Sequence, residues 1–421
     1  MVAVVDAQPP PRPHAPLRRS LTLTNAVLYG LGVTIGAGIY VLVGAAAARA
    51  GMAAPLAFAA AAVLMGLTAA SFAELVGRMP VAAGEAAYVA AAFQSERLGM
   101  AVGLLVTAVA VVSGAAIVVG AAGYVGVVVP LPEPVLIVAI VLAMAAVAAW
   151  GIKESVVFAG VMTVIEVGGL ALLIAAGVGG GEVVHRLPEM LPPASPAGLA
   201  GIAGAALLAV FAFLGFDSIV NIAEETREPR RTMPRAIFLT LALATLLYML
   251  VVWVAVVAVP PAELAASKAP LALVFGRLTG ASPLAMTLIA IVATLNGIIV
   301  QIIMASRVLY GLAARGSLPE WLREVSPITR TPLNATLLTA AVVLGLALLL
   351  PLERLADWTS RITLVLFALV NLALTRIKAR ESEPPPGIGY VVPAWVPWAG
   401  CASCLALVAL DALLALPGPR P

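Results

Sequence analysis

Long apolar runs separated by short polar or proline-rich breaks dominate the chain. A helix that crosses a bilayer needs about 20 mostly apolar residues. The runs are continuous and do not alternate with a period of two, which argues against a transmembrane barrel. We therefore expect an all-α polytopic membrane protein with about 11 transmembrane helices. The predicted spans are 25–48, 55–76, 98–122, 134–150, 155–178, 200–223, 236–258, 282–306, 334–350, 360–375 and 391–416.

The composition supports this fold class. The 421 residues are 62% hydrophobic and 11% charged, whereas a typical soluble domain has about 25% charged residues. Such a chain can neither cover a soluble core nor stay disordered in water. The net charge of +3 is scattered, so no nucleic acid partner is expected. Cys401 and Cys404 lie in an apolar run without further ligands nearby, so we expect no metal and no cofactor.

The distribution of basic residues predicts the orientation. If the N-terminus is cytoplasmic, 17 of the 24 Lys and Arg residues fall on the cytoplasmic side, and only Arg361, at the edge of the tenth span, falls inside a span. This is the positive-inside pattern. The proline-rich tail, residues 1–24, lacks the apolar core of a signal peptide, so we expect it to stay in the cytoplasm. The Ala- and Val-rich composition fits the inner (cytoplasmic) membrane of a bacterium.

Two spans carry residues that a continuous helix does not favour. The first contains GLGVTIGAGIY, with four glycines between positions 30 and 38, and each costs about 1 kcal/mol relative to Ala in a helix interior. Close helix packing through Gly32 and Gly36 would also explain this run. The sixth span, however, reads FAFLGFDS, with Gly215 and Asp217 near its middle. Together the two patterns predict that both helices are interrupted.

The positions of these interruptions predict two inverted repeats. The affected spans each begin a block of five helices, and an odd number of spans turns the second block upside down relative to the first. Paired interruptions in such repeats mark a substrate site near the bilayer midplane. The expected organisation is a cytoplasmic tail (1–24), a first repeat (25–178), an extracytoplasmic loop (179–199), a second repeat (200–376), and a cytoplasmic loop with span eleven and a short tail (377–421).

Polar side chains inside the spans are candidates for coupling and support. Glu166 lies at mid-depth in the fifth span, where an ionised carboxylate costs roughly 3 kcal/mol or more. It is either a proton carrier or a protonated acid bonded to a neighbouring helix. Asp217, with Ser218, is expected to accept N–H groups where the second half-helix begins. Asn296 in the eighth span either bonds a neighbouring helix or contacts a cavity.

With these motifs in view, the chain resembles the amino acid–polyamine–organocation (APC) transporter superfamily, and within it bacterial amino acid permeases near the cationic amino acid transporter branch. This resemblance implies the inverted-repeat leucine-transporter fold. The matching segments are GVTIGAGIYVLVG (32–44), FAELVGRMPVAAGEAAYV (72–89), FAFLGFDSIVNIAEETREPRRTMPRAI (211–237), SRVLYGLAARGSLPEWL (306–322), RTPLNATLL (330–338) and VPAWVPWAG (392–400).

The resemblance also implies which residues meet a substrate. Backbone N–H groups at the first break would hold a carboxylate, and carbonyl groups at the sixth-span break would hold an amino group. Phe213 and Phe216 would gate the pocket. The residues implied for substrate binding are Ile35, Gly36, Ala37, Gly38, Phe211, Ala212, Phe213 and Gly215.

The chain departs from this superfamily in two ways. Some members have a Lys where Glu166 stands, so the resemblance does not fix the coupling ion: a proton is expected, and sodium stays open. Most members also have twelve spans, whereas eleven are expected here.

The resulting expectation is a secondary active transporter that moves amino acids by alternating access and proton symport. Its expected partners are the amino acid and the lipid bilayer, with no obligatory protein partner. The alternatives are an amino acid exchanger, a polyamine carrier and an amino acid sensor that does not transport. An enzyme is not expected, because the spans contain no nucleophile–base pair or catalytic metal cluster.

Overall fold

Helices make up nearly all of the described chain. The computed structural model describes residues 20–36, 38–80, 84–150, 156–179, 185–192, 195–381 and 384–414. Within these residues there is no β-sheet, and the single β-bridge joins Leu21 to Thr226. Nine helical stretches of the described chain are long and apolar enough to cross a membrane. The prediction of an all-α polytopic membrane protein is therefore confirmed.

Each of the eleven predicted spans corresponds to a helix or to a pair of helices. The first span consists of α1 (Leu23–Ile35) and α2 (Gly38–Ala50), and the sixth of α9 (Pro196–Ala212) and the 3-10 helix η3 (Asp217–Glu225). The other spans are α3 (Ala54–Arg78), α5 (Glu96–Val128), α6 (Glu133–Trp150), α7 (Val156–Gly179), α10 (Pro229–Ala258), α13 (Leu284–Ala314), α14 (Leu333–Leu349), α15 (Leu352–Arg380) and α16 (Trp395–Leu414).

Helix α15 begins eight residues before the predicted tenth span, and this part of the prediction was wrong. Its first turns contain Asp357, which lies before the predicted span, and Arg361, which lies at the edge of it. In the fold, Asp357 pairs with Arg49 at 2.8 Å and Arg361 pairs with Asp411 at 2.6 Å. Because each charge has a partner from another helix, the helix continues through both residues.

Short helices occupy connections that the sequence pattern left without structure. They are too short to cross a membrane. Helix α12 places Leu271, Val274 and Phe275 in the core, so its single apolar face explains why it forms. The short helices are α4 (Gly84–Phe93), α11 (Pro261–Ala266), α12 (Pro270–Thr279), η1 (Gly51–Ala53), η2 (Leu187–Met190) and η4 (Glu320–Arg323).

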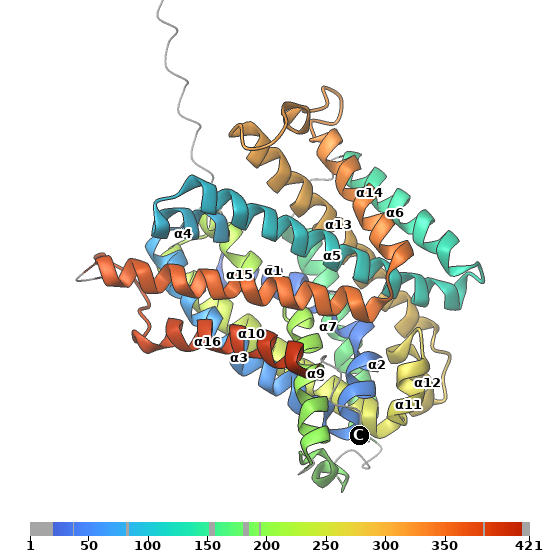
Figure 1. Cartoon of the computed structure of the whole chain (residues 1–421). Coiled ribbons are helices and arrows are strands. Elements are labelled where there is room, and N and C mark those ends of the chain that lie inside the picture. Colours follow the sequence, from blue (N-terminus) through green and yellow to red (C-terminus); the bar gives the residue numbers. More distant parts are fainter. Residues whose placement is uncertain are drawn as a thin grey trace, which may run out of the picture.

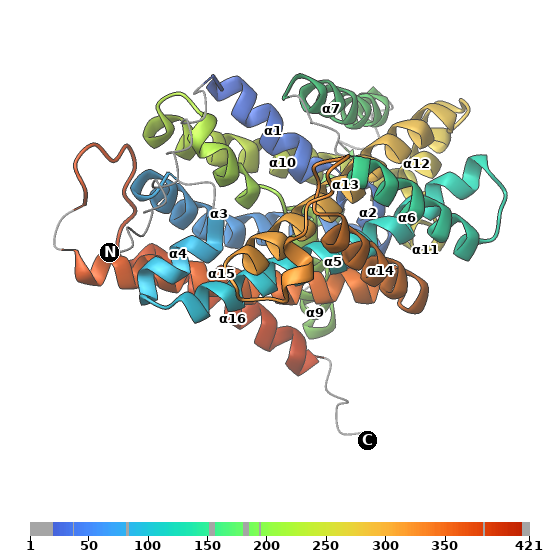
Figure 2. The same cartoon turned by 90° about the horizontal axis from the view of Figure 1, so that it is seen from above.

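The long helices pack in pairs that relate the two halves of the chain. Figure 1 shows α3, α5, α15 and α16 side by side, with α6, α13 and α14 together at one end. Figure 2 shows α1, α7 and α10 grouped on one side of the molecule. Helices at equivalent places in the two halves contact each other: α3 with α10, α5 with α13, α6 with α14, and α2 with α9. Contacts between equivalent helices are expected if the chain consists of two five-helix repeats. We keep this division of the chain as a proposal.

A buried carboxylate joins α3, α15 and the segment before α16 at one end of these helices. Glu74 of α3 has no exposed surface and lies 2.6 Å from Arg78 and 2.8 Å from the Lys378 ammonium group of α15. It also accepts the backbone N–H of Val392, just before α16, at 2.8 Å. Removing one member of such a buried cluster leaves an unpaired charge and is strongly destabilising. We call these residues the Glu74 cluster.

Candidate functional site

The two interrupted helices break at neighbouring places. Helix α1 ends at Ile35 and α2 starts at Gly38, so Gly36 lies between them. Ala37, which was predicted to bind substrate, lies outside the described residues. Helix α9 ends at Ala212, and η3 begins five residues later at Asp217. The glycine patterns of both spans therefore predicted real interruptions.

Two glycines allow the breaks to touch. A Cβ atom on Gly38 would lie 2.7 Å from the Cα of Ala212. Gly215 has φ of +119°, and a Cβ atom there would lie 2.7 Å from the carbonyl carbon of Val33. Only glycine adopts such backbone angles without strain. The chain thus brings the α1 break and the α9 break into direct backbone contact.

Hydrogen bonds fix both breaks. The Tyr248 hydroxyl of α10 lies 2.7 Å from the carbonyl oxygen of Thr34 and 2.8 Å from that of Ala212. A hydroxyl has one proton, so it donates to one of these carbonyl groups at a time. The Asp217 carboxylate accepts the backbone N–H of Gly215 at 2.9 Å. This N–H precedes η3 and does not belong to its first turn, so the supporting role expected of Asp217 stays a prediction.

A small cavity lies between the breaks and helices α5 and α13. Its volume is about 30 Å³. A single water needs about 10–15 Å³, so the cavity holds water but no amino acid in this conformation. The Thr34 hydroxyl and the Gln301 side-chain oxygen, which both belong to lining residues, have no hydrogen-bond partner among the described residues. The lining consists of Gly32, Val33, Thr34, Gly38, Ser113, Ile117, Phe211, Leu214, Asn296, Gly297, Val300 and Gln301.

The cavity includes some of the predicted site residues and leaves out others. Gly38, Phe211 and Asn296 line it. The remaining described candidates, Ile35, Gly36, Ala212, Phe213 and Gly215, belong to the two breaks but do not line the cavity. Their role in binding stays a prediction.

The sequence interpretation missed several polar lining residues. Neither Ser113 nor Gln301 was among the predicted site residues. Both are polar residues in long apolar helices, a signal that marks candidates but does not show which way a helix face turns.

The two predicted gate residues lie in aromatic clusters. The Phe213 ring centre is 5.2 Å from that of Tyr248. The Phe216 ring centre is 6.0 Å from that of Phe72 and 5.5 Å from that of Phe367. Both phenylalanines are fully buried. In this conformation they join α9 and η3 to the surrounding helices, and a gating role stays a prediction.

Glu166 is fully buried in α7, close to the cavity wall. Neither carboxyl oxygen has a hydrogen-bond partner among the described residues, although the Asn296 side chain approaches the group. The backbone carbonyl of Glu166 accepts the Tyr40 hydroxyl at 2.9 Å. The neighbourhood holds the backbone in place and leaves the carboxyl group available for a proton or cation.

Ionic and backbone contacts close the molecule on both sides of the cavity. On one side, Arg49 of α2 binds both carboxylate oxygens of Asp357 at 3.0 and 2.8 Å, and it donates to the Gly204 carbonyl of α9 at 2.9 Å. On the other side, Leu21 donates its N–H to Glu225 at 3.0 Å and accepts that of Arg227 at 2.9 Å. Each contact joins the α1–α2 segment to other helices.

A second acidic group, which the sequence interpretation did not identify, lies near the α9 break. Glu85 in the first turn of α4 is buried beside the Asp217 carboxyl group. Burial and the charge of Asp217 raise the pKa of Glu85 to about 8. Two such carboxyl groups cannot both ionise without a large repulsion. The short helix α4 thus meets η3 through a pair of buried carboxyl groups.

Comparison with known proteins places this architecture in a family. The sequence model of the amino acid permease family matches residues 21–421. The chain belongs to this family. Like other permeases, it is a multi-pass membrane transporter and not an enzyme. This confirms the resemblance drawn from the sequence motifs.

Individual relatives span several transporter types. An uncharacterized transporter of Mycobacterium tuberculosis is 32% identical over 87% of this chain and 82% of the relative. The branched-chain amino acid permease BcaP of Bacillus subtilis is 28% identical over 88% of this chain and 83% of the relative. A mitochondrial cationic amino acid transporter of Arabidopsis thaliana is 28% identical over 87% of this chain, which covers 63% of that longer protein.

Proposed function

We propose that this permease carries amino acids across the cytoplasmic membrane by alternating access, with a proton as the coupling ion. The observation that carries the proposal is the meeting of two interrupted helices at a small cavity with two polar atoms that lack a partner among the described residues, Thr34 Oγ1 and Gln301 Oε1. Unpaired buried polar atoms are rare in proteins and indicate a missing partner. A ligand that fills the cavity would supply it.

The ends of the broken helices match the two charges of an amino acid. Helix α2 begins at the lining residue Gly38, and the first N–H groups of a helix attract a carboxylate. The carbonyl groups of Thr34 and Ala212 share one hydroxyl proton from Tyr248, so one of them can accept an ammonium group. Because a polyamine has no carboxylate, an amino acid fits this arrangement better.

The lining favours a neutral, apolar side chain. Ile117, Leu214 and Val300 supply apolar surface, and no charged residue occurs among the described lining residues. A cationic side chain would need an acidic partner in such a buried site. We therefore expect neutral aliphatic amino acids to compete for uptake and arginine or lysine to compete poorly.

Glu166 is the proposed proton carrier. It is a buried acid close to the lining residue Asn296, and neither of its oxygens has a hydrogen-bond partner within the described chain. A carboxyl group in this position can exchange a proton when the structure opens and keep it when the structure closes. Sodium remains the alternative ion, since the same two oxygens could bind a cation.

The test is uptake of labelled amino acids into proteoliposomes with an imposed pH gradient and no sodium. We expect accumulation that a protonophore abolishes. In Glu166→Gln, accumulation should fall to the background level while substrate binding persists. Glu353→Gln is the matched control, because Glu353 is exposed in the first turn of α15.

Other outcomes would replace parts of the proposal. Exchange against preloaded amino acid without accumulation would make the permease an antiporter. Binding without any flux would make it a sensor. Accumulation that requires sodium would show that sodium, and not the proton, is the coupling ion. Unchanged uptake in Glu166→Gln would show that this residue does not take part in coupling.

A further inference from the structure

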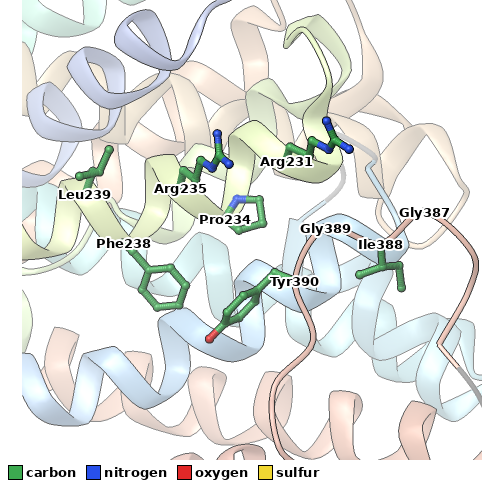
Figure 3. Close-up of a pocket in the computed structure, with 9 residues that line it drawn as sticks. All are labelled: Arg231, Pro234, Arg235, Phe238, Leu239, Gly387, Ile388, Gly389 and Tyr390. Carbon is green, nitrogen blue, oxygen red and sulfur yellow. The ribbon is translucent and has the colours of Figure 1, made fainter.

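A second and much larger cavity lies at the start of α10, away from the two breaks. It measures about 700 Å³ and is open to the outside. One wall is the first part of α10 and the other is the segment that precedes α16 (Figure 3). Its lining residues are Arg231, Pro234, Arg235, Phe238, Leu239, Gly387, Ile388, Gly389 and Tyr390. We call it the α10 cavity.

The cavity lies where the exposed face of α10 changes from basic to apolar. Arg231 and Arg235 are exposed and one helical turn apart, and Figure 3 shows both guanidinium groups on the same side of the helix. Leu239, Leu243 and Leu246 continue the exposed side of α10, with 44%, 41% and 56% of their surface accessible. Exposed leucines on a spanning helix contact lipid tails, whereas arginines beside them lie at the headgroup level.

The arginines are free to bind an anion. Arg235 makes no hydrogen bond or ion pair with any described residue. Arg231 approaches Glu228 at only 4.0 Å, and both side chains are about three-quarters exposed. An exposed ion pair of this kind contributes little to stability. The protein therefore neutralises almost none of the positive charge that these two arginines bring to the cavity.

The opposite wall is held close to α10 by specific contacts. Arg230 donates to the Pro386 carbonyl at 2.8 Å. A Cβ atom on Gly389 would lie 2.4 Å from the Arg230 carbonyl oxygen, so this position requires glycine. The rings of Phe238 and Tyr390 meet edge to face at 5.2 Å and form the apolar end of the cavity. The cavity is thus a formed site with a cationic end and an aromatic end.

We propose that the α10 cavity binds an anionic phospholipid of the cytoplasmic leaflet. Arg231 and Arg235 hold the phosphate, because guanidinium groups form paired hydrogen bonds with phosphate oxygens. The acyl chains lie along Phe238, Tyr390 and the exposed leucines of α10. Basic pockets between membrane helices on the cytoplasmic side are suited to such headgroups. The leaflet follows from the orientation proposed for the chain, and the lipid site is independent of the transported substrate.

Native mass spectrometry of the detergent-solubilised permease tests the proposal with phosphatidylglycerol and phosphatidylcholine of equal chain length. We expect phosphatidylglycerol to bind more tightly than phosphatidylcholine. The double variant Arg231→Gln, Arg235→Gln should weaken phosphatidylglycerol binding about tenfold or more, given about 1 kcal/mol for each arginine near an anionic surface. The double variant Arg231→Lys, Arg235→Lys keeps the charge and should retain most of the binding.

The matched control is Arg315→Gln, Arg323→Gln, which removes the same charge outside the cavity and should bind as the unmodified protein does. Equal binding of the two lipids, or unchanged phosphatidylglycerol binding in Arg231→Gln, Arg235→Gln, would overturn the proposal. Inorganic phosphate is the other source of the same chemistry, and its adduct has a different mass. If phosphate alone binds and displaces the lipid, the cavity is a phosphate site.

Discussion

At the residue scale, the close approach of the two breaks depends on glycine. Gly215 combines a positive φ with backbone neighbours from α1 at 2.7 and 2.8 Å from a hypothetical Cβ atom. We predict that Gly215→Ala lowers stability by about 1–3 kcal/mol, because the side chain strains the backbone and pushes the breaks apart. Thermal unfolding in detergent and uptake in proteoliposomes measure both effects, and uptake should be lost.

Gly66 provides the matched control for this substitution. It lies in the interior of α3, and a Cβ atom there would meet nothing within 4 Å. Gly66→Ala should therefore leave stability unchanged or raise it slightly, since Ala favours helix more than Gly does. Equal effects of the two substitutions would contradict the proposed contact between the breaks.

Also at this scale, the Glu85–Asp217 pair predicts a pH-dependent stability. The pKa of Glu85 is raised to about 8 by burial and by Asp217. Its stabilising contribution is complete below its ordinary pKa, near 4.5, and is lost as the pH rises through about 8. Thermal unfolding of Glu85→Gln should lack this loss, so the variant should gain stability relative to the unmodified protein as the pH rises from about 4.5 to about 8, the interval between the two values.

The exposed acid Glu353 serves as the reference for this titration. Glu353→Gln is the control substitution, because it removes an exposed acid outside the pair. A Glu85→Gln curve that stays parallel to that of the unmodified protein would show that the pair does not take up a proton in this range.

At the scale of elements, the Arg49–Asp357 pair joins α2 to α15 and, through Gly204, to α9. Its side chains are 25% and 16% exposed, so the pair contributes about 1 kcal/mol or somewhat more. We predict that Arg49→Gln opens this side of the molecule and speeds labelling of Ser113→Cys in the cavity about fivefold, as that energy implies. The rate of reaction with a membrane-impermeant thiol reagent is the measurement.

Another ion pair supplies the control for this experiment. Arg277 of α12 pairs with Glu263 of α11 at 2.6 Å, and both residues are largely exposed. Arg277→Gln should not change the labelling rate of Ser113→Cys. If it accelerates labelling as much as Arg49→Gln does, a general loosening and not the contact between α2 and α15 would be responsible.

Sequence prediction succeeded best for the helices and their interruptions. Span length and glycine content are local properties, so the eleven spans and both interruptions could be predicted. The start of α15 could not, because Asp357 and Arg361 are compensated by residues far away in the chain.

The lining of the cavity depends on how each helix is rotated, which explains why Ser113 and Gln301 were missed. Glu85 was missed for a related reason, since its importance comes from Asp217 on another element. Sequence patterns thus indicated where the breaks lie but not which side chains meet there.

At the scale of the whole molecule, the proposed orientation can be tested directly. Leu191 follows η2 and is 72% exposed, and Arg315 is exposed at the end of α13. We predict that a membrane-impermeant maleimide labels Leu191→Cys in intact cells and Arg315→Cys only after lysis. The unmodified protein, with Cys401 and Cys404, gives the background. The reverse result would place the N-terminus outside.

The Glu74 cluster has a consequence for how the molecule can move. At the Glu74 cluster, α3, α15 and the segment before α16 cannot separate without leaving buried charges exposed or unpaired. By contrast, the hydrogen bonds that join Leu21 to Glu225 and Arg227, at the end of η3, are between backbone groups. We therefore expect that any opening on this side of the molecule displaces the start of α1, while the Glu74 cluster stays in place. Because the Leu21 contacts can separate more easily than the Glu74 cluster, the amide hydrogens of Leu21 and Arg227 should exchange with water well before that of Val392.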